Sequence, residues 1–205
     1  MGNKVKTTFT NAGINIADFP TKINGTGNDE ALIPELVIDT SQPYAADAVI
    51  RKDLSILDGY DGVFYGCDVY DVIPDCEEFY SDILSATNGG HIVIRDSFVY
   101  PGQYSTGSVI EVYDSNNNLS SKYISVVFGD VDGDGSITSL DGSIVTDHDA
   151  LITLIDEDSV EFIAADANGD GCVNSTDAVI IETEELYGTL INQREVGDLH
   201  FGFWW

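Results

Sequence analysis

Two twelve-residue stretches of this chain carry oxygen-bearing side chains at the same spacing. They are DVDGDGSITSLD, from Asp130 to Asp141, and DANGDGCVNSTD, from Asp166 to Asp177. Each has Asp, Asn or Thr at positions 1, 3, 5, 9 and 12 and a glycine at position 6. A hard cation such as Ca²⁺ takes six to eight oxygen ligands, and EF-hand loops supply them at this spacing around a sharp glycine turn. Two full matches therefore predict two calcium sites rather than two metal-free acidic turns.

The ligands of both ions follow from the loop positions. They are expected to be Asp130, Asp132, Asp134, Ser136, Thr138 and Asp141 in the first loop and Asp166, Asn168, Asp170, Cys172, Asn174 and Asp177 in the second. Position 7 supplies its backbone carbonyl, so Cys172 should bind through oxygen, because a thiolate is a poor ligand for Ca²⁺. Carboxylates crowded without a cation would repel one another, so folding of this region should depend on calcium.

The elements around the loops differ from a standard EF-hand. Position 12 is Asp141 or Asp177, where an EF-hand usually has Glu, so the following helix must lie closer to the ion or a water must fill the gap. The segment that enters the first loop, KYISVVFG, alternates and is rich in β-branched and aromatic residues, which predicts a strand. The first motif should therefore consist of a loop and an exiting helix only.

Paired loop–helix motifs of this kind resemble the dockerin modules of bacterial cellulosomes and amylosomes. The resemblance covers about residues 129–192, where GDVDGDG and ADANGDG are similar to the family's loop leads. GSIVTDHDALITLI and AVIIETEELYGTLI occupy the positions of the family's helices. The resemblance implies a non-catalytic, calcium-dependent module that binds a cohesin and tethers a secreted parent protein to a scaffoldin or cell surface.

The same resemblance implies where a partner would bind. Loop positions 10 and 11 carry much of the cohesin contact in the family, and here they are Ser139, Leu140, Ser175 and Thr176. Two other interpretations are open at these positions: Ser and Thr favour helix capping, and Leu140 could be a core residue. Since the two pairs differ, binding through one face or through both is also open.

The region before the loops is expected to be rich in β-structure. Runs such as ELVIDT, GHIVIRDSFVY and GSVIEVYD are separated by turn clusters, which predicts a sandwich-like sheet domain. One helix is expected at Cys76 to Ala86, ended by Asn88-Gly89-Gly90, and a shorter helical turn near Ala46 to Leu54.

The predicted fold is α+β, with a β-rich domain at 1–128 and a small all-α dockerin of two loop–helix motifs at 129–205. No Pro/Ser-rich linker separates them. Residues 79–128 also resemble the X-module, a small β-domain that precedes dockerins, through the run STGSVIEVYDSNNNLSSKYISVVFGDVDGDG. That resemblance implies that the β-domain packs against the dockerin and stiffens it.

Composition restricts the function classes. The net charge is −28 with only eight Lys and Arg residues, which argues against nucleic acid and anionic membranes as partners. No apolar stretch approaches the roughly 20 residues of a membrane span. His91, His148 and His200 lack metalloprotease spacing, and no nucleophile elbow or P-loop occurs, so no enzyme activity is expected. The start lacks the apolar region of a signal peptide, so we expect a piece of a longer secreted protein.

Other functions and contacts remain as alternatives. A calcium-stabilised carbohydrate-binding protein would use exposed aromatic side chains. The candidates are Tyr60, Phe64, Tyr65, Tyr70, Tyr100, Tyr104 and the tail HFGFWW, and the alternative is that such residues pack in the core. A plain calcium sensor is disfavoured because the first loop lacks an entering helix. We expect the aromatic tail, Leu199 to Trp205, to pack within the molecule. Contact with a partner is the second interpretation of the tail. Cys67 and Cys76 could form a disulfide or stay free.

Overall fold

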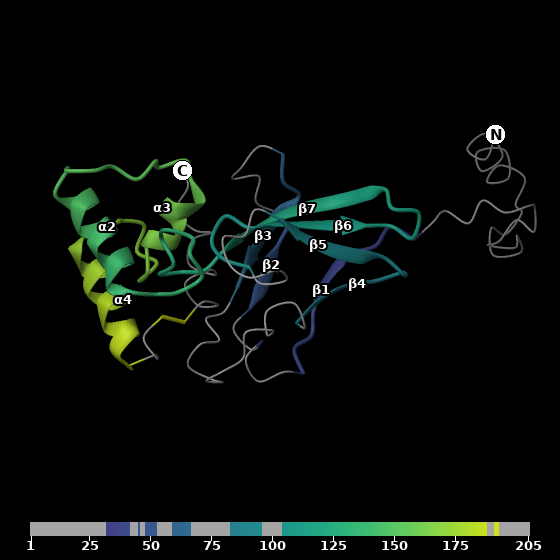
Figure 1. Ribbon diagram of the computed structural model, residues 1–205, viewed down its shortest axis with the longest axis horizontal. Helices are drawn as coiled ribbons and strands as arrows, with labels where there is room; N and C mark the ends of the chain where they lie inside the picture. The colour runs from purple at the N-terminus through teal and green to yellow at the C-terminus, as the bar shows by residue number, and fades with distance from the viewer. Residues whose placement is uncertain are drawn as a thin grey trace, which may run out of the picture. The chain divides into compact units, whose positions relative to one another are not determined.

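The computed structural model describes residues 32–41, 45, 48–52, 59–66, 83–95, 104–187 and 191–192 (Figure 1). The chain divides into two compact units, Met1–Leu32 and Ile33–Trp205, and every element below belongs to the second. The strands are β1 Leu36–Ile38, β2 Val49–Arg51, β3 Gly62–Tyr65, β4 Leu84–Ala86, β5 His91–Arg95, β6 Val109–Tyr113 and β7 Leu119–Val126. The helices are α2 Ser139–Asp149, α3 Val160–Ala165 and α4 Ser175–Tyr187. Strands precede helices, as expected for the predicted α+β fold.

Five strands form one mixed sheet in the order β2-β3-β7-β6-β5. Strands β5, β6 and β7 are antiparallel neighbours, whereas β3 lies parallel to β7 with Gly62 opposite Tyr123. The strand expected before the first loop is confirmed as β7, which has hydrogen-bonded neighbours on both sides. The chain therefore enters the first predicted calcium loop from a central strand of the sheet.

Two predicted helical segments contain strands instead. Leu84–Ala86, the end of the helix expected at Cys76 to Ala86, is β4 and pairs with β1 in a separate two-stranded ribbon. Val49–Arg51, inside the turn of helix expected near Ala46 to Leu54, is β2 and pairs with β3. Both predictions are wrong at these residues because pairing with another strand overrides the local pattern. Residues 76–82, 46–47 and 53–54 lie outside the described residues.

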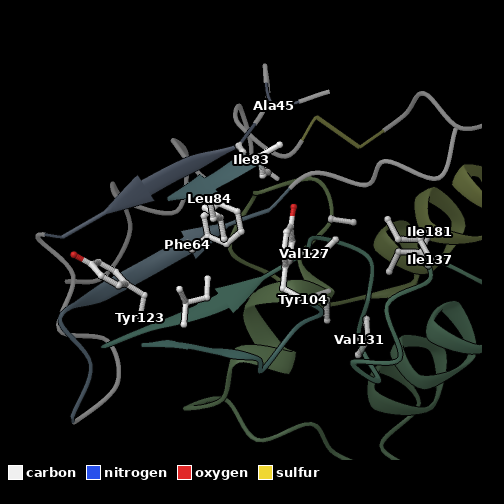
Figure 2. Packing of buried hydrophobic residues seen from close by; sticks show 14 of the residues in the cluster. Ala45, Phe64, Ile83, Leu84, Tyr104, Tyr123, Val127, Val131, Ile137 and Ile181 are labelled. Atoms are coloured by element: carbon white, nitrogen blue, oxygen red, sulfur yellow. The ribbon is translucent and has the colours of Figure 1, made fainter. Parts of the chain in front are cut away.

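A continuous buried cluster connects one face of the sheet with the C-terminal helices (Figure 2). The sheet contributes Phe64, Ile110, Val112 and Tyr123, and the helical part contributes side chains such as Val131, Ile137, Val145 and Ile181. The Phe64 and Tyr104 rings meet edge to face with centroids 4.9 Å apart. Since the same buried cluster includes side chains of both the sheet and the helix pair, the two parts share a core.

A second buried cluster covers part of the other sheet face. Val63 and Tyr65 of β3 and Ile124 and Val126 of β7 pack with Val160 and Ile163 of α3, and the Tyr65 ring stacks on Phe128 at 5.5 Å. Helix α3 was not predicted, although Ser159 marks its start by accepting a hydrogen bond from the Phe162 N–H at 3.2 Å. This helix fixes the entry to the second loop against the sheet.

Helices α2 and α4 lie in the two segments expected to be helical and pack closely. A side chain on Gly142 would place its Cβ 2.7 Å from Glu182 Cγ and 3.1 Å from the Ala178 carbonyl oxygen. Helix α2 is shorter than predicted: it ends at Asp149 because Leu151 takes a left-handed conformation, with φ at 58°. Within the described residues, no helix is long and apolar enough to cross a membrane.

Candidate functional site

The first loop follows β7 directly, through a turn at Gly129 whose φ is 98°. Carboxylate oxygens of Asp130, Asp132 and Asp134 all lie within 4.8 Å of one another. Asp130 is 1% exposed, while Asp132 and Asp134 face solvent. The carboxylates at loop positions 1, 3 and 5 are therefore gathered around one point. The carboxylate at position 1 lies in the interior, and those at positions 3 and 5 lie at the surface.

Asp141, the position 12 residue, is buried where α2 begins. Its Oδ1 accepts hydrogen bonds from the Val131 and Asp132 N–H groups at 2.8 and 3.1 Å. Its Oδ2 accepts one from the Thr138 N–H at 2.9 Å, and Thr138 is the N-cap of the helix. Thr138 and Asp141 thus form a capping box that joins the loop to the first turn of α2.

The second loop repeats this hydrogen-bond pattern. Asp177 accepts from the Asn168 N–H at 3.2 Å and from the Asn174 N–H at 3.0 Å, which matches the bonds of Asp141 to positions 3 and 9. At position 1, Asp166 accepts from the Gly171 N–H at 2.8 Å and from the Asp170 N–H at 3.1 Å. Each loop therefore aims carboxylates at its own interior and ends at a helix N-terminus.

Glycines permit the reversal that brings the halves of each loop together. Gly133 and Gly135 have φ values of 73° and 86°, and Gly169 and Gly171 have values of 70° and 84°. These values are in the left-handed region, which costs a residue with a Cβ about 1–2 kcal/mol. The glycine at position 6 thus does what the spacing predicted, and the glycine at position 4 is a second requirement of the same turn.

Burial makes ionised carboxylates costly at these sites. Desolvation raises the pKa of Asp130 to about 7 and the pKa of Asp177 to about 6, against an ordinary value of 3.8. Burial also raises the pKa of Asp141 and of Asp166. Among the described residues, no ion pair joins Asp130 or Asp141 to a basic side chain. A bound cation would supply the missing compensation.

The donor set fits calcium. The candidate ligand atoms are carboxylate, amide, hydroxyl and carbonyl oxygens, which suit a hard cation. Cys172 is an exposed free thiol, and its backbone N–H donates to Asp170 Oδ1 at 2.9 Å. The acidic cluster of the first loop is therefore suited to hold an ion. In the second loop, the oxygen atoms can serve as ligands without the Cys172 sulfur.

The four expected contact residues lie at the N-termini of α2 and α4. Ser139 and Leu140 begin α2, Ser175 and Thr176 begin α4, and all four are exposed. Leu140 is 57% exposed, so it is not a core residue. The capping interpretation does not apply to the serines and Thr176, because Thr138 caps α2 and the Asn174 side chain accepts from the Thr176 N–H at 2.8 Å.

Each helix N-terminus also binds a carboxylate from the other helix. The Ser139 N–H donates to Glu185 Oε2 at 2.9 Å, and the Ser175 N–H donates to Asp149 Oδ2 at 3.1 Å. The two helices are therefore antiparallel, and each end of the pair presents one loop and one helix C-terminus. Sequence reasoning missed Asp149 and Glu185, because only the packing of α2 on α4 brings them to these amides.

Exposed apolar side chains follow those carboxylates in sequence. Leu186 and Tyr187 come directly after Glu185 and are 72% and 71% exposed, and Leu151 and Ile152 come soon after Asp149 and are 78% and 71% exposed. These four side chains are therefore accessible to solvent near the C-terminal ends of α2 and α4.

Three of the aromatic residues considered for sugar binding are in the core. Phe64, Tyr65 and Tyr104 are at most 1% exposed, so they offer no face for a sugar ring. Tyr60 is partly buried, and the Lys122 ammonium lies 5.3 Å from its ring centroid. Tyr70, Tyr100, the tail 199–205 and the Cys67 and Cys76 pair lie outside the described residues.

Residues 128–184 match the family model of the dockerin type I domain. This range contains both loops, α2, α3 and most of α4. No curated protein and no solved structure matched the chain. Dockerin domains bind calcium, so the match and the acidic cluster of the first loop agree on the metal.

Proposed function

We propose that this chain is a non-catalytic assembly module that binds a cohesin in a calcium-dependent manner. Its dockerin-like part would tether a larger parent protein to a scaffoldin or a cell surface outside the cell. The observation that carries the proposal is the matched pair of loops, each ending in a helix whose first two residues are exposed. The dockerin match over residues 128–184 supports it.

Two calcium ions are part of the proposal. The first would be held by Asp130, Asp132, Asp134, the Ser136 carbonyl, Thr138 and Asp141, and the second by Asp166, Asn168, Asp170, the Cys172 carbonyl, Asn174 and Asp177. Each ion would neutralise carboxylates that burial makes costly, and would fix the direction in which a helix leaves its loop. Removing calcium should therefore abolish partner binding even where the chain stays folded.

The proposed partner surface consists of Ser139 and Leu140 at one end of the helix pair and Ser175 and Thr176 at the other. Because the two ends carry different residues, a cohesin should prefer one of them. The sheet would belong to a supporting domain at 1–128 that shares its core with the dockerin at 129–205, as an X-module does. A net charge of −28 disfavours nucleic acid and anionic membranes as partners.

Calorimetry against a panel of cohesins, with Ca²⁺ and then with EDTA, tests the proposal. We expect tight binding to at least one cohesin and its complete loss on chelation. Two paired variants then locate the face: Ser139→Asp with Leu140→Asp, and Ser175→Asp with Thr176→Asp. One pair should weaken binding strongly while the other serves as its control. No binding by any cohesin to a chain whose calcium sites are filled would refute the proposal.

A further inference from the structure

We propose that Thr106, which lies outside both loops, is a positioning residue for the first calcium site. It would hold the Asp130 carboxylate in the orientation that the ion requires, so that the affinity of this site depends on the turn before β6. This inference rests on the proposed binding of calcium by the first loop. The second loop would be independent of Thr106.

The backbone of Thr106 contacts the buried carboxylate directly. Its N–H donates a hydrogen bond to Asp130 Oδ2 at 2.9 Å, while Asp130 Oδ1 accepts from the Gly135 N–H inside the loop at 3.3 Å. Thr106 is 4% exposed and Asp130 is 1% exposed, so water does not compete for this bond. The orientation of the carboxylate is thus set by one amide within the loop and one from the sheet domain.

The side chain of Thr106 fixes that amide in place. Its Oγ1 donates to the Val127 carbonyl oxygen at 3.2 Å and accepts from the Val127 N–H at 3.1 Å. Val127 lies three residues before Asp130. The hydroxyl therefore clamps the turn onto the chain segment that leads from β7 into the loop.

The loop approaches Thr106 more closely than any side chain would permit. A Cβ on Gly133 would lie 2.7 Å from the Thr106 carbonyl oxygen, a distance that real Cβ atoms essentially never show. Position 4 of the first loop must therefore be glycine for two reasons, its φ of 73° and this contact. The backbone of Thr106 thus contacts the loop at both Asp130 and Gly133.

The turn that carries Thr106 is itself rigid and buried. Ser105, Ser108 and Ser125 are all fully buried, and the Ser105 N–H donates to Ser108 Oγ at 2.9 Å. Ser125 of β7 donates its hydroxyl to the Ser108 carbonyl oxygen at 3.1 Å. Since these bonds anchor the turn to the central strand, its amide is a fixed donor rather than an adaptable one.

The described hydrogen bonds of Thr106 reach Asp130 and Val127 and no residue of the second loop. In that loop, the Asp170 and Gly171 N–H groups donate to Asp166 from within the loop itself. In the first loop, one of the donors to Asp130 is Thr106, which lies outside the loop. The two sites should therefore respond differently to changes in the sheet domain.

The test is a Ca²⁺ titration of the full chain by NMR, which follows the Gly135 and Gly171 amides as separate reporters of the two loops. Thr106→Val removes the hydroxyl clamp but keeps the side-chain shape. We expect it to weaken calcium binding at the first loop by about tenfold, because that is the change in affinity that corresponds to the loss of a buried hydrogen bond. Binding at the second loop should stay unchanged, and Thr106→Ser should restore the first.

A control separates positioning from general destabilisation. Val112→Ala leaves a cavity beside β6 of the same sheet. No described hydrogen bond joins the Val112 side chain to the Thr106 turn or to the first loop. It should lower the melting temperature and leave the affinity ratio of the two loops unchanged. An equal loss of affinity at both loops in Thr106→Val, or the same loss in Val112→Ala, would overturn the inference.

A matched glycine pair tests the backbone contact. Gly133→Ala and Gly171→Ala both place a side chain at a left-handed position, with φ values of 73° and 84°, but a Cβ on Gly171 would meet nothing within 4 Å. Because Gly133 also meets Thr106, its substitution should cost its loop more affinity than Gly171→Ala costs the second loop. Equal losses would count against the inference. If the unmodified chain bound no calcium at all, the proposed function itself would fail, which is a distinct outcome.

Discussion

The Asp149 carboxylate at the C-terminus of α2 accepts a hydrogen bond from the Ser175 N–H at the N-terminus of α4. Glu185 near the end of α4 makes the corresponding bond to Ser139 at the start of α2. A carboxylate at a helix N-terminus is stabilised by the helix dipole and by the unpaired amides there. The two bonds therefore fasten the antiparallel helices at both ends, next to the proposed partner contacts.

Asp149→Ala should lower the free energy of unfolding of the calcium-loaded chain by about 1 kcal/mol, because it leaves the first amide of α4 without its acceptor. Thermal unfolding with excess Ca²⁺ measures this. Glu157→Ala is the control, since it removes an exposed carboxylate for which no hydrogen bond is described. If both variants lost the same stability, the effect would be one of net charge and not of the Ser175 bond.

Stability should depend on pH in opposite ways with and without calcium. Burial raises the pKa of Asp130 to about 7 and of Asp177 to about 6, above the values of an unfolded chain. A carboxyl with a raised pKa stabilises the fold below its unfolded pKa, and this contribution is lost as pH rises through the folded pKa. The calcium-free chain should therefore lose roughly 2–4 kcal/mol of stability between pH 4.5 and 7.5.

The calcium-loaded chain should show the reverse trend, because protons compete with Ca²⁺ for the same oxygens and affinity falls as pH falls through 7. Chemical unfolding at several pH values, with Ca²⁺ and with EDTA, gives both curves. Parallel pH profiles in the two conditions would contradict this account.

Gly142→Ala should destabilise the helix pair. Alanine is the better helix former by about 1 kcal/mol, yet its Cβ would approach the Ala178 carbonyl oxygen and Glu182. We expect the clash to prevail, with a net loss of about 1–2 kcal/mol in a denaturant titration. Ser143→Ala, at an exposed position of the same helix, should be nearly neutral. A stabilising effect of Gly142→Ala would show that the helices can move apart at little cost.

Cys172 should contribute to the second site through its backbone only. Cys172→Ser should leave calcium affinity within about twofold of the unmodified chain, because a hard cation takes the carbonyl oxygen at position 7. Asp170→Ala should weaken the second site by a factor of about 10–100, since it removes a carboxylate aimed into the loop. Titration calorimetry compares the two. A large loss with Cys172→Ser would indicate that the thiol takes part.

The sequence predicted what depends on local spacing. The loops, the strand before Asp130 and the existence of α2 and α4 follow from residue types within a dozen positions of one another. The residues Leu84–Ala86 were misassigned, because their strand state depends on pairing with β1 some fifty residues earlier in the chain. The early end of α2 depends on the left-handed conformation of Leu151. Because this residue is a leucine and not a glycine, the sequence does not signal the end of the helix there.

Long-range contacts also explain what the sequence could not reveal about the site. Thr106 lies 24 residues before Asp130, and Glu185 lies 46 residues after Ser139. No spacing rule connects these pairs, since only the folded sheet and the packed helices bring them together. The residue types of Ser105 to Gly107 are compatible with a turn, but they do not reveal that the Thr106 N–H donates to the Asp130 carboxylate.

The parallel pairing of β3 with β7 has a mechanical consequence. The covalent chain between β7 and the helix pair runs through Val127 to Gly129, so a pull on the helix pair that travels along the chain acts on the C-terminal end of β7. The bonds of β7 to β3 and β6 run across the axis of the strand, so they would resist the pull together rather than open one after another. A pull of this kind would load those bonds in shear.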